Sequence, residues 1–265
     1  FGIFRSMATK LLHSFANPSI FIQGASAGIG LQFVRECLGQ SHVSRVFASC
    51  RDPWKARNGE LVQLADADPR LTLVKMDITD EAQVSDAAST IMGSVKAVHL
   101  LVNCAGVLHQ GGMRPERQLA DVHPENLAHS FAVNAIGPLL VVKHLSPLFP
   151  RAERCVVVNI SARVGSIGDN KLGGWYAYRA AKAAQNQLTR TMAIELARKH
   201  KQLSVIALHP GTVATALSEP FQQNVRPETL QSSAECVLRL IQVIDGLTVD
   251  DNGSFLAWDG RPIPW

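Results

Sequence analysis

Apolar residues in this chain fall into short, nearly continuous runs, separated by longer segments with apolar residues at helical spacing. Valine, isoleucine and leucine dominate the runs, as expected for strands buried on both faces of a parallel sheet. We predict strands at about 19–23, 45–50, 71–76, 98–102, 155–160, 203–208 and 254–257. The segments between them predict helices at about 29–38, 54–66, 80–93, 124–146, 175–199 and 227–243.

Seven strands alternating with helices predict an α/β fold, a Rossmann-like doubly wound parallel sheet with helices on both faces. The 265 residues suffice for one domain with a full core, so we expect a single domain over 1–265. Residues 1–6 precede Met7 and are interpreted as a vector-derived or truncated extension outside the fold. Two irregular stretches, about 105–123 and 209–226, follow strand ends, where open α/β sheets bind ligands.

Composition and charge limit the classes of binding partner that the chain is expected to have. A net charge of +4 suits a small anionic ligand, and no Lys/Arg block typical of nucleic-acid binding occurs. No apolar run approaches the roughly 20 residues of a membrane span, so we expect neither nucleic-acid nor membrane binding. Five cysteines without a C-x-x-C pair favour reduced thiols in a cytoplasmic protein. The histidine spacing matches no metal motif, so no metal site is expected.

A glycine-rich turn, Gly24-Ala-Ser-Ala-Gly28-Ile-Gly30, lies between the first predicted strand and the first predicted helix. Glycine permits a tight turn and close approach of the backbone to a phosphate. The following helix N-terminus supplies free N–H groups and the positive end of its dipole. The turn therefore predicts a dinucleotide-binding domain. The expected contacts are Gly24, Ser26, Ala27, Gly28, Ile29 and Gly30.

The same turn also fits the Gly-x-Ser-x-Gly nucleophile elbow of hydrolases, with Ser26 as nucleophile and His209 as its partner. That alternative stays open but leaves Tyr178 and Lys182 without a role. A P-loop is excluded because no Gly-Lys-Ser/Thr follows the turn.

The tip of the second predicted strand bears on the choice of nicotinamide cofactor. A carboxylate at this point binds the ribose hydroxyls of NAD, whereas an arginine suits the 2′-phosphate of NADP. Arg51 takes the first tip position and Asp52 the next. We therefore predict NADP, with NAD less favoured.

Tyr178 and Lys182 stand four residues apart in a helix-forming stretch, so they share one helix face, which Tyr176 does not. A cation beside a phenol is expected to lower the phenol's pKa from its usual value of about 10. Such a tyrosine can donate a proton to a developing alkoxide or take one from an alcohol. The pair therefore predicts acid–base catalysis beside the cofactor.

With these motifs assembled, the chain resembles the short-chain dehydrogenase/reductase family over about residues 19–257. Its turn is similar to the family's T-G-x-x-x-G-x-G, with Gln23 in place of Thr, and Tyr178 with Lys182 matches Y-x-x-x-K. The segments 160–167, 173–179 and 259–265 most resemble C-factor and sniffer-type carbonyl reductases.

The resemblance implies further roles. It makes Asn134 the fourth catalytic residue, anchoring a water that leads protons from Lys182 to solvent, and it lets Lys182 bind the nicotinamide ribose. Cys104 replaces the second Asn of the family's N-N-A-G. The cofactor contacts implied beyond the turn and Arg51 are Asp77, Ile78, Asn103, Ala105, Gly106, Tyr178, Lys182, Pro210, Gly211, Thr212 and Val213.

One departure concerns the family's catalytic serine, because Ala162 stands where it is expected. Ser161 or Ser166 could supply the hydroxyl, or Tyr178 could work without one. Ser161 is the first candidate, although it would need a backbone adjustment to face the substrate, since side chains alternate along a strand.

The predicted function is NADP-dependent hydride transfer between nicotinamide and a small carbonyl or alcohol substrate, with Tyr178 as general acid/base. The alternative is a cofactor-binding signalling or regulatory protein with little turnover, which Ala162 favours. Members of the family often form homodimers or homotetramers through the helices corresponding to 124–146 and 175–199, and monomers also occur. Substrate residues are expected in two stretches, with Leu108, His109, Met113, Arg114 and Arg117 in the first, and Leu217, Phe221 and Arg226 in the second.

Overall fold

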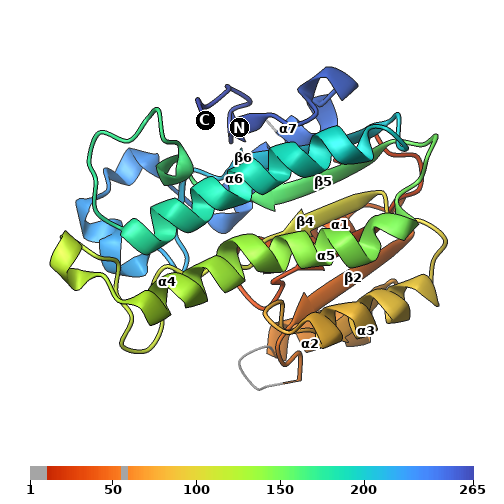
Figure 1. The fold of residues 1–265 in the computed structure, drawn as a ribbon. Coiled ribbons are helices and arrows are strands. Elements are labelled where there is room, and N and C mark those ends of the chain that lie inside the picture. The colour runs from red at the N-terminus through yellow and green to blue at the C-terminus, as the bar shows by residue number, and fades with distance from the viewer. Residues whose placement is uncertain (1–10, 55–58) are drawn as a thin grey trace, which may run out of the picture.

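The computed structural model describes residues 11–54 and 59–265, so the interpretation of residues 1–6 lies outside the described residues. Seven parallel strands form one sheet in the order β3-β2-β1-β4-β5-β6-β9 (Figure 1). This order confirms the predicted doubly wound α/β fold. The strands are β1 Ser19–Gln23, β2 Arg45–Cys50, β3 Leu71–Lys75, β4 Leu100–Asn103, β5 Cys155–Ile160, β6 Leu203–His209 and β9 Phe255–Ala257.

The helices agree with the predicted ones in order, with differences at several ends. They are α1 Gly28–Leu38, α2 Gly59–Ala67, α3 Glu81–Met92, α4 Pro124–Phe131, α5 Gly137–Leu145, α6 Tyr176–Leu196 and α7 Ser233–Gly246. The predicted start of α2 falls partly on residues 55–58, outside the described residues. Helix α7 begins at 233 rather than 227 because Ser232 and Glu235 form a capping box.

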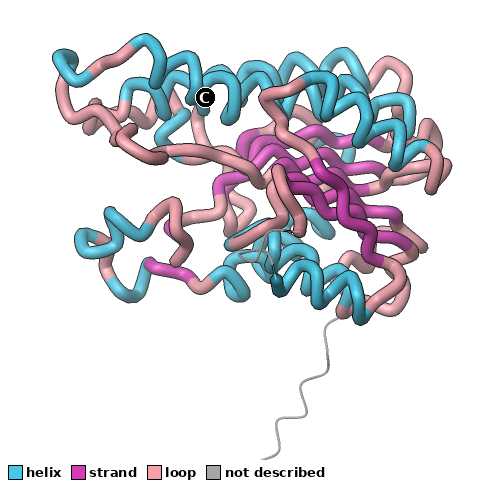
Figure 2. Tube along the Cα trace, turned by 90° about the horizontal axis from the view of Figure 1, so that it is seen from below, coloured by secondary structure: helices cyan, strands magenta, loops and turns pink. Residues whose placement is uncertain are grey.

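Helices cover both faces of the sheet, as Figures 1 and 2 show. Alternate residues of β1 separate the two cores: Ile20 and Ile22 pack with α1 and α7, whereas Phe21 packs with α3, α5 and α6. This alternation is the period of two that strand geometry imposes. The sheet is therefore buried on both faces, which explains its continuous apolar runs.

The predicted helix 124–146 is one stretch with a π-helical segment, Ala132–Ile136, between α4 and α5. Among the described residues, Pro124–Leu148 is long and apolar enough by composition to cross a membrane, contrary to the sequence estimate. Its residues Val141, Val142 and Leu145 are buried in the core against the sheet. The apolar side chains of this stretch therefore pack into the protein core.

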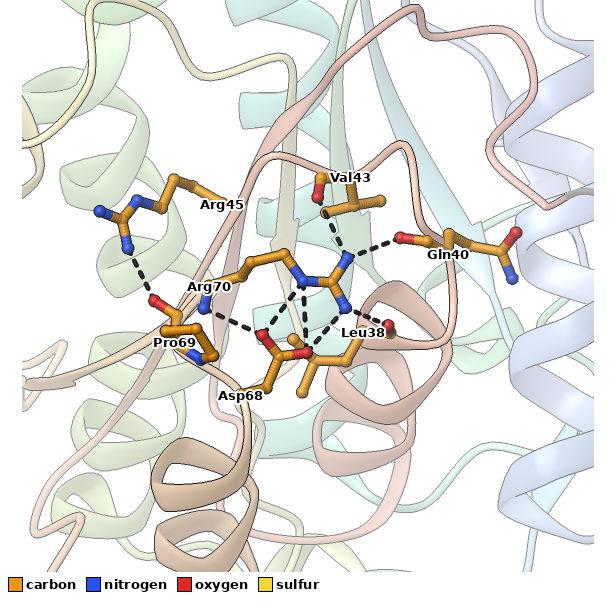
Figure 3. Close-up of polar contacts among 7 residues, drawn as sticks. All are labelled: Leu38, Gln40, Val43, Arg45, Asp68, Pro69 and Arg70. Atoms are coloured by element: carbon orange, nitrogen blue, oxygen red, sulfur yellow. Dashed lines mark hydrogen bonds and ion pairs between the residues drawn. The ribbon is translucent and has the colours of Figure 1, made fainter.

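Arg70 joins the turn before β2 to the turn before β3, and Figure 3 shows its polar contacts. Its guanidinium donates to Leu38 O at 2.5 Å, Gln40 O at 2.8 Å and Val43 O at 3.2 Å, and pairs with Asp68. The hydrogen bonds between the two side chains raise the pKa of Arg70 and lower the pKa of Asp68. One side chain therefore binds carbonyls at the end of α1 and in the turn after it, and holds the start of β3 beside them.

The chain leaves the sheet after β6 and makes an excursion beyond the carboxyl ends of the strands. This excursion holds the short strands β7 Thr212–Val213 and β8 Leu230–Gln231, paired in parallel, and a 3₁₀ helix at Glu219–Asn224. It therefore lies on the side of the sheet where a ligand is expected.

Candidate active site

The glycine turn has the geometry that a phosphate site needs. The N–H groups of Gly24 and Ala25 both donate to Ser49 O at 2.9 Å, which folds the turn against β2. Gly24 has φ +79°, and a Cβ there would lie 2.5 Å from Ala105 N. A Cβ on Gly30 would lie 2.2 Å from Gly24 O. Glycine is therefore required at both positions, and the open N-terminus of α1 follows directly.

Gln23, which replaces the family's threonine, has a structural role at the end of β1. Its Oε1 accepts a hydrogen bond from Ala105 N at 3.0 Å, and the backbone N of Cys104 donates to Gln23 O at 2.9 Å. The glutamine thus fastens the ends of β1 and β4, which both feed into the site.

A cavity of about 680 Å³ opens at the carboxyl ends of the strands. It runs from the glycine turn to Tyr178 and Lys182 and continues under the 212–225 excursion. The predicted site residues that line it are Gly24, Ser26, Ala27, Gly28, Ile29, Gly30, Arg51, Asp77, Ile78, Ala105, Gly106, Ser161, Tyr178, Lys182, Pro210, Gly211, Thr212 and Val213. Asn103 and Asn134 are absent from the lining. The cradle of the turn, the helix N-terminus and this volume fit a dinucleotide.

Tyr178 and Lys182 are both buried on the first turns of α6. Lys182 Nζ lies 5.8 Å from the centre of the Tyr178 ring. It donates to Ile160 O at 2.8 Å and to Gln185 Oε1 at 2.9 Å. The ammonium is therefore held between the end of β5 and the next turn of α6. Tyr176 is 39% exposed and does not line the cavity.

The expected lowering of the tyrosine pKa is wrong for the protein alone. Burial raises the pKa of the Tyr178 phenol, because desolvation disfavours phenolate. Burial also lowers the pKa of Lys182 to about 7. Near neutral pH, Tyr178 is thus a protonated phenol beside a lysine that is close to its titration midpoint.

Asn134 sits in the π-helical segment and is fully buried. Its Oδ1 accepts from Val107 N at 3.0 Å, and its Nδ2 donates to Val107 O at 2.8 Å and Ser130 Oγ at 3.1 Å. A Cβ on Gly106 would lie 3.2 Å from Asn134 Oδ1 and 4.0 Å from Lys182 Nζ. Gly106 therefore keeps the space between the two side chains open.

Neither candidate serine directs a free hydroxyl proton at the cavity. Ser161 Oγ donates to Asn186 Oδ1 at 2.6 Å, and Ser166 Oγ donates to Pro264 O at 2.5 Å. Ser161 and Ala162 both line the cavity. The Ser161 hydroxyl proton is engaged by Asn186 Oδ1, and the catalytic role of Ser161 stays a prediction.

Asn103, expected to contact the cofactor, does not line the cavity and belongs to a buried polar chain beneath it. Its Nδ2 donates to Asn159 Oδ1 at 2.8 Å, and Asn159 Nδ2 donates to Thr189 Oγ1 at 2.9 Å. Thr189 Oγ1 donates in turn to Gln185 O at 2.7 Å. This chain crosses from β4 through β5 to α6. It fixes the helix that carries Tyr178 relative to the sheet.

The hydrolase alternative fails on the histidine. Burial, with Arg163 nearby, lowers the pKa of His209 to about 4, so the imidazole would be a weak base. His209 Nδ1 also has no hydrogen-bond partner in the described part of the chain, as a triad histidine would need. Within residues 11–54 and 59–265, no group of three or more His, Cys, Asp or Glu side chains could hold a metal ion.

Three residues of the site escaped the sequence analysis. Trp175 lines the cavity, Gln185 binds Lys182, and the buried Glu116 accepts from Ala177 N at 3.2 Å at the start of α6. Gln185 lies three residues after Lys182, a helical-neighbour spacing that could have indicated the contact. Nothing local in the sequence brings Glu116 to α6.

Comparison with known proteins gives the family. Residues 18–226 match the model of the short chain dehydrogenase family. The chain belongs to this family. An uncharacterized oxidoreductase of Schizosaccharomyces pombe is 30% identical over 94% of this chain and 98% of its own length.

Relatives with a named activity or signal are also found. The NADPH-bound carbonyl reductase from chicken fatty liver has 31% identity and a TM-score of 0.84, with 93% of this chain and 98% of that chain covered. The carbonyl reductase Sniffer of D. melanogaster has 25% identity and a TM-score of 0.82, covering 93% and 99% of the two chains. The C-signal of Myxococcus xanthus is 33% identical over 63% of this chain and 93% of its own length. The chain is therefore a member of an oxidoreductase family, and the solved structures similar to it include carbonyl reductases.

Proposed function

We propose that this short chain dehydrogenase reduces carbonyl compounds with NADPH, and that Tyr178 is the general acid. The observation that carries the proposal is the buried, protonated phenol of Tyr178 on the wall of a cavity that also holds the glycine turn. The NADPH-bound chicken carbonyl reductase supports NADP as the cofactor.

Different residues of the cavity would bind different parts of the cofactor. The backbone N–H groups at 26–30 would hold the pyrophosphate, Arg51 the 2′-phosphate and Lys182 the nicotinamide ribose hydroxyls. Asp77 and Ile78 line the same cavity and would border the adenine. When bound, NADPH would supply the hydride.

Tyr178 then donates its phenolic proton to the carbonyl oxygen as negative charge develops there. An alkoxide is a far stronger base than a phenolate, so the raised pKa of Tyr178 does not prevent this step. Alcohol oxidation would instead need Tyr178 as phenolate, which burial disfavours. The site is therefore better suited to reduction than to oxidation near neutral pH.

Lys182 and Asn134 would return the proton to Tyr178. Asn134 Oδ1 accepts one hydrogen bond, from Val107 N, and a carbonyl oxygen has a second lone pair for a water. The space kept open by Gly106 lies between that oxygen and Lys182 Nζ. A water there would link the ammonium to solvent.

The test is NADPH oxidation with a panel of aldehydes and diketones. We expect measurable turnover that falls at least about a hundredfold in Tyr178→Phe, the usual size of a lost general acid. NADPH affinity should be unchanged in that variant, and Tyr176→Phe, at an exposed neighbouring aromatic, should retain turnover. Turnover that survives in Tyr178→Phe would remove the proposed acid.

A second candidate is a cofactor-binding regulatory protein with little turnover. Ala162 in the cavity, the engagement of Ser161 with Asn186, and the similarity to the C-signal of Myxococcus xanthus favour it. Tight NADPH binding without turnover of any carbonyl in the panel would select this candidate.

A further inference from the structure

The residues before α6 form a left-handed turn that ends in a strained tryptophan. Gly173, Gly174 and Trp175 follow one another with φ values of +65°, +64° and +51°. Glycine adopts this conformation freely, whereas a residue with a Cβ is strained in it. Strain of this kind persists only where the surrounding structure enforces it, and it gathers at functional sites.

The turn is fastened from two sides. Trp175 N donates to Glu116 O at 2.6 Å, while the side chain of Glu116 accepts from Ala177 N at 3.2 Å. Arg179 Nε donates to Gly173 O at 3.1 Å and to Gly174 O at 3.0 Å. These contacts hold the backbone of Trp175 in its strained conformation and so fix the direction of its side chain.

The indole held in this way lies in the cavity, in contact with other rings. Its centroid is 5.0 Å from the Phe221 ring and 6.4 Å from the Tyr178 ring. All three side chains line the cavity. Centroid separations of about 4.5–7 Å are those at which aromatic rings attract one another. The proposed acid thus stands beside an aromatic wall.

A second contact keeps Phe221 in place. The His109 ring packs edge-on against Phe221 at 6.1 Å, and its Nε2–H donates to Leu217 O at 3.1 Å. Leu217 reaches inward, since a Cβ on Gly106 would lie 3.9 Å from Leu217 Cδ1 and 4.0 Å from Lys182 Nζ. The two irregular stretches therefore meet over the catalytic pair and present the rings there.

We propose that Trp175 and Phe221 are specificity-determining residues that receive a flat aryl group attached to the carbonyl reduced at Tyr178. The inference rests on the proposed function and names its substrate class as aryl aldehydes and ketones. Leu108 and Val225 line the same cavity and add apolar surface. An aryl ring can stack on the indole, whereas a saturated ring of the same size can make only apolar contact.

The test compares ring pairs of equal size. Acetophenone and cyclohexyl methyl ketone are compared by kcat/KM, and benzamide and cyclohexanecarboxamide by calorimetric affinity, because the two amides need no turnover. In Trp175→Leu the preference for the aryl partner should shrink by about two- to tenfold relative to the unmodified chain in both measurements. Leucine keeps a Cβ, so the backbone strain is matched. Phe221→Leu, which involves no strained backbone, should act in the same direction.

Tyr176→Leu is the control, since it removes a neighbouring ring that does not line the cavity. An aryl preference that is equal in the unmodified chain, Trp175→Leu and Phe221→Leu would overturn the proposal, as would the absence of benzamide binding to the unmodified chain. Amide selectivity that depends on Trp175 without turnover of any ketone would keep the aryl site and reject the proposed reductase.

Discussion

Gln185 offers a direct way to change the charge of Lys182. It is 1% exposed, and its Oε1 is one of two acceptors of the ammonium, the other being Ile160 O at 2.8 Å. With burial holding the pKa of Lys182 near 7, a change in these contacts alters its charge at neutral pH. We predict that Gln185→Glu raises the pKa of Lys182 and that Gln185→Leu lowers it.

The magnitudes follow from the hydrogen bond. A carboxylate at this distance favours the ammonium by about one to three pKa units. Leucine removes a charge-assisted hydrogen bond of about 1.5–3 kcal/mol, which lowers the pKa by roughly one to two units. Gln185 Nε2 has no partner among the described residues, but its loss affects both charge states of Lys182 equally and leaves the pKa unchanged.

The assay is the affinity for NADPH from pH 5 to 10, measured by the fluorescence of the bound dinucleotide. Affinity should fall as Lys182 loses its proton, with a midpoint near pH 7 in the unmodified chain, higher in Gln185→Glu and lower in Gln185→Leu. The folded pKa of Lys182 lies below its unfolded value of about 10.4, so the unfolded chain binds more protons between the two values. The unfolding free energy therefore rises with pH between the folded and the unfolded pKa of Lys182. This pH range is narrower in Gln185→Glu, because the folded pKa of Lys182 is higher there. Midpoints that coincide, or that move in the same direction in both variants, would refute this account.

Three other changes test the frame of the site. Gly30→Ala places a Cβ 2.2 Å from Gly24 O and should weaken NADPH binding more than about a hundredfold in fluorescence titration, whereas Gly246→Ala, with nothing within 4 Å, should not. Arg51→Ala should weaken NADPH by about tenfold and leave NADH unchanged, measured by KM for each. Arg70→Ala should lower the unfolding free energy in urea by about 2 kcal/mol, because three backbone carbonyls lose their donor.

The strands and the glycine turn could be predicted because their signals are local. A strand buried on both faces needs a continuous apolar run, and Ile20, Phe21 and Ile22 are buried on alternate sides as that pattern requires. The break between α4 and α5 gave no such signal. It coincides with Asn134, whose side chain binds the backbone of Val107, 27 residues earlier.

The candidate site divides in the same way. Helical spacing sufficed to place Tyr178 and Lys182 together, because their relation is fixed within α6. Their pKa values were not predictable, since they depend on burial beneath segments far along the chain. The strained Trp175 is also a long-range effect, enforced by Glu116 from another loop.

Ala162 stands where the family's catalytic serine is expected, and the effect of this difference can be measured in Ala162→Ser. It lies in the cavity with an extended backbone at φ −146° and ψ 143°, so serine fits there without strain. Because Ser161 is bonded to Asn186, Ala162→Ser would add a hydroxyl donor for the developing oxyanion. A lost donor of this kind lowers kcat by about 10²–10³, so a gained one should raise it by roughly tenfold or more.

The control for Ala162→Ser is Ala162→Cys, which has similar size and a weaker donor. A serine variant that is no faster than the cysteine variant would mean that Tyr178 alone supports the oxyanion. A faster serine variant would mean that the unmodified chain has the proton donor Tyr178 but lacks a second hydrogen bond to the developing oxyanion. The missing hydrogen bond would then limit its kcat.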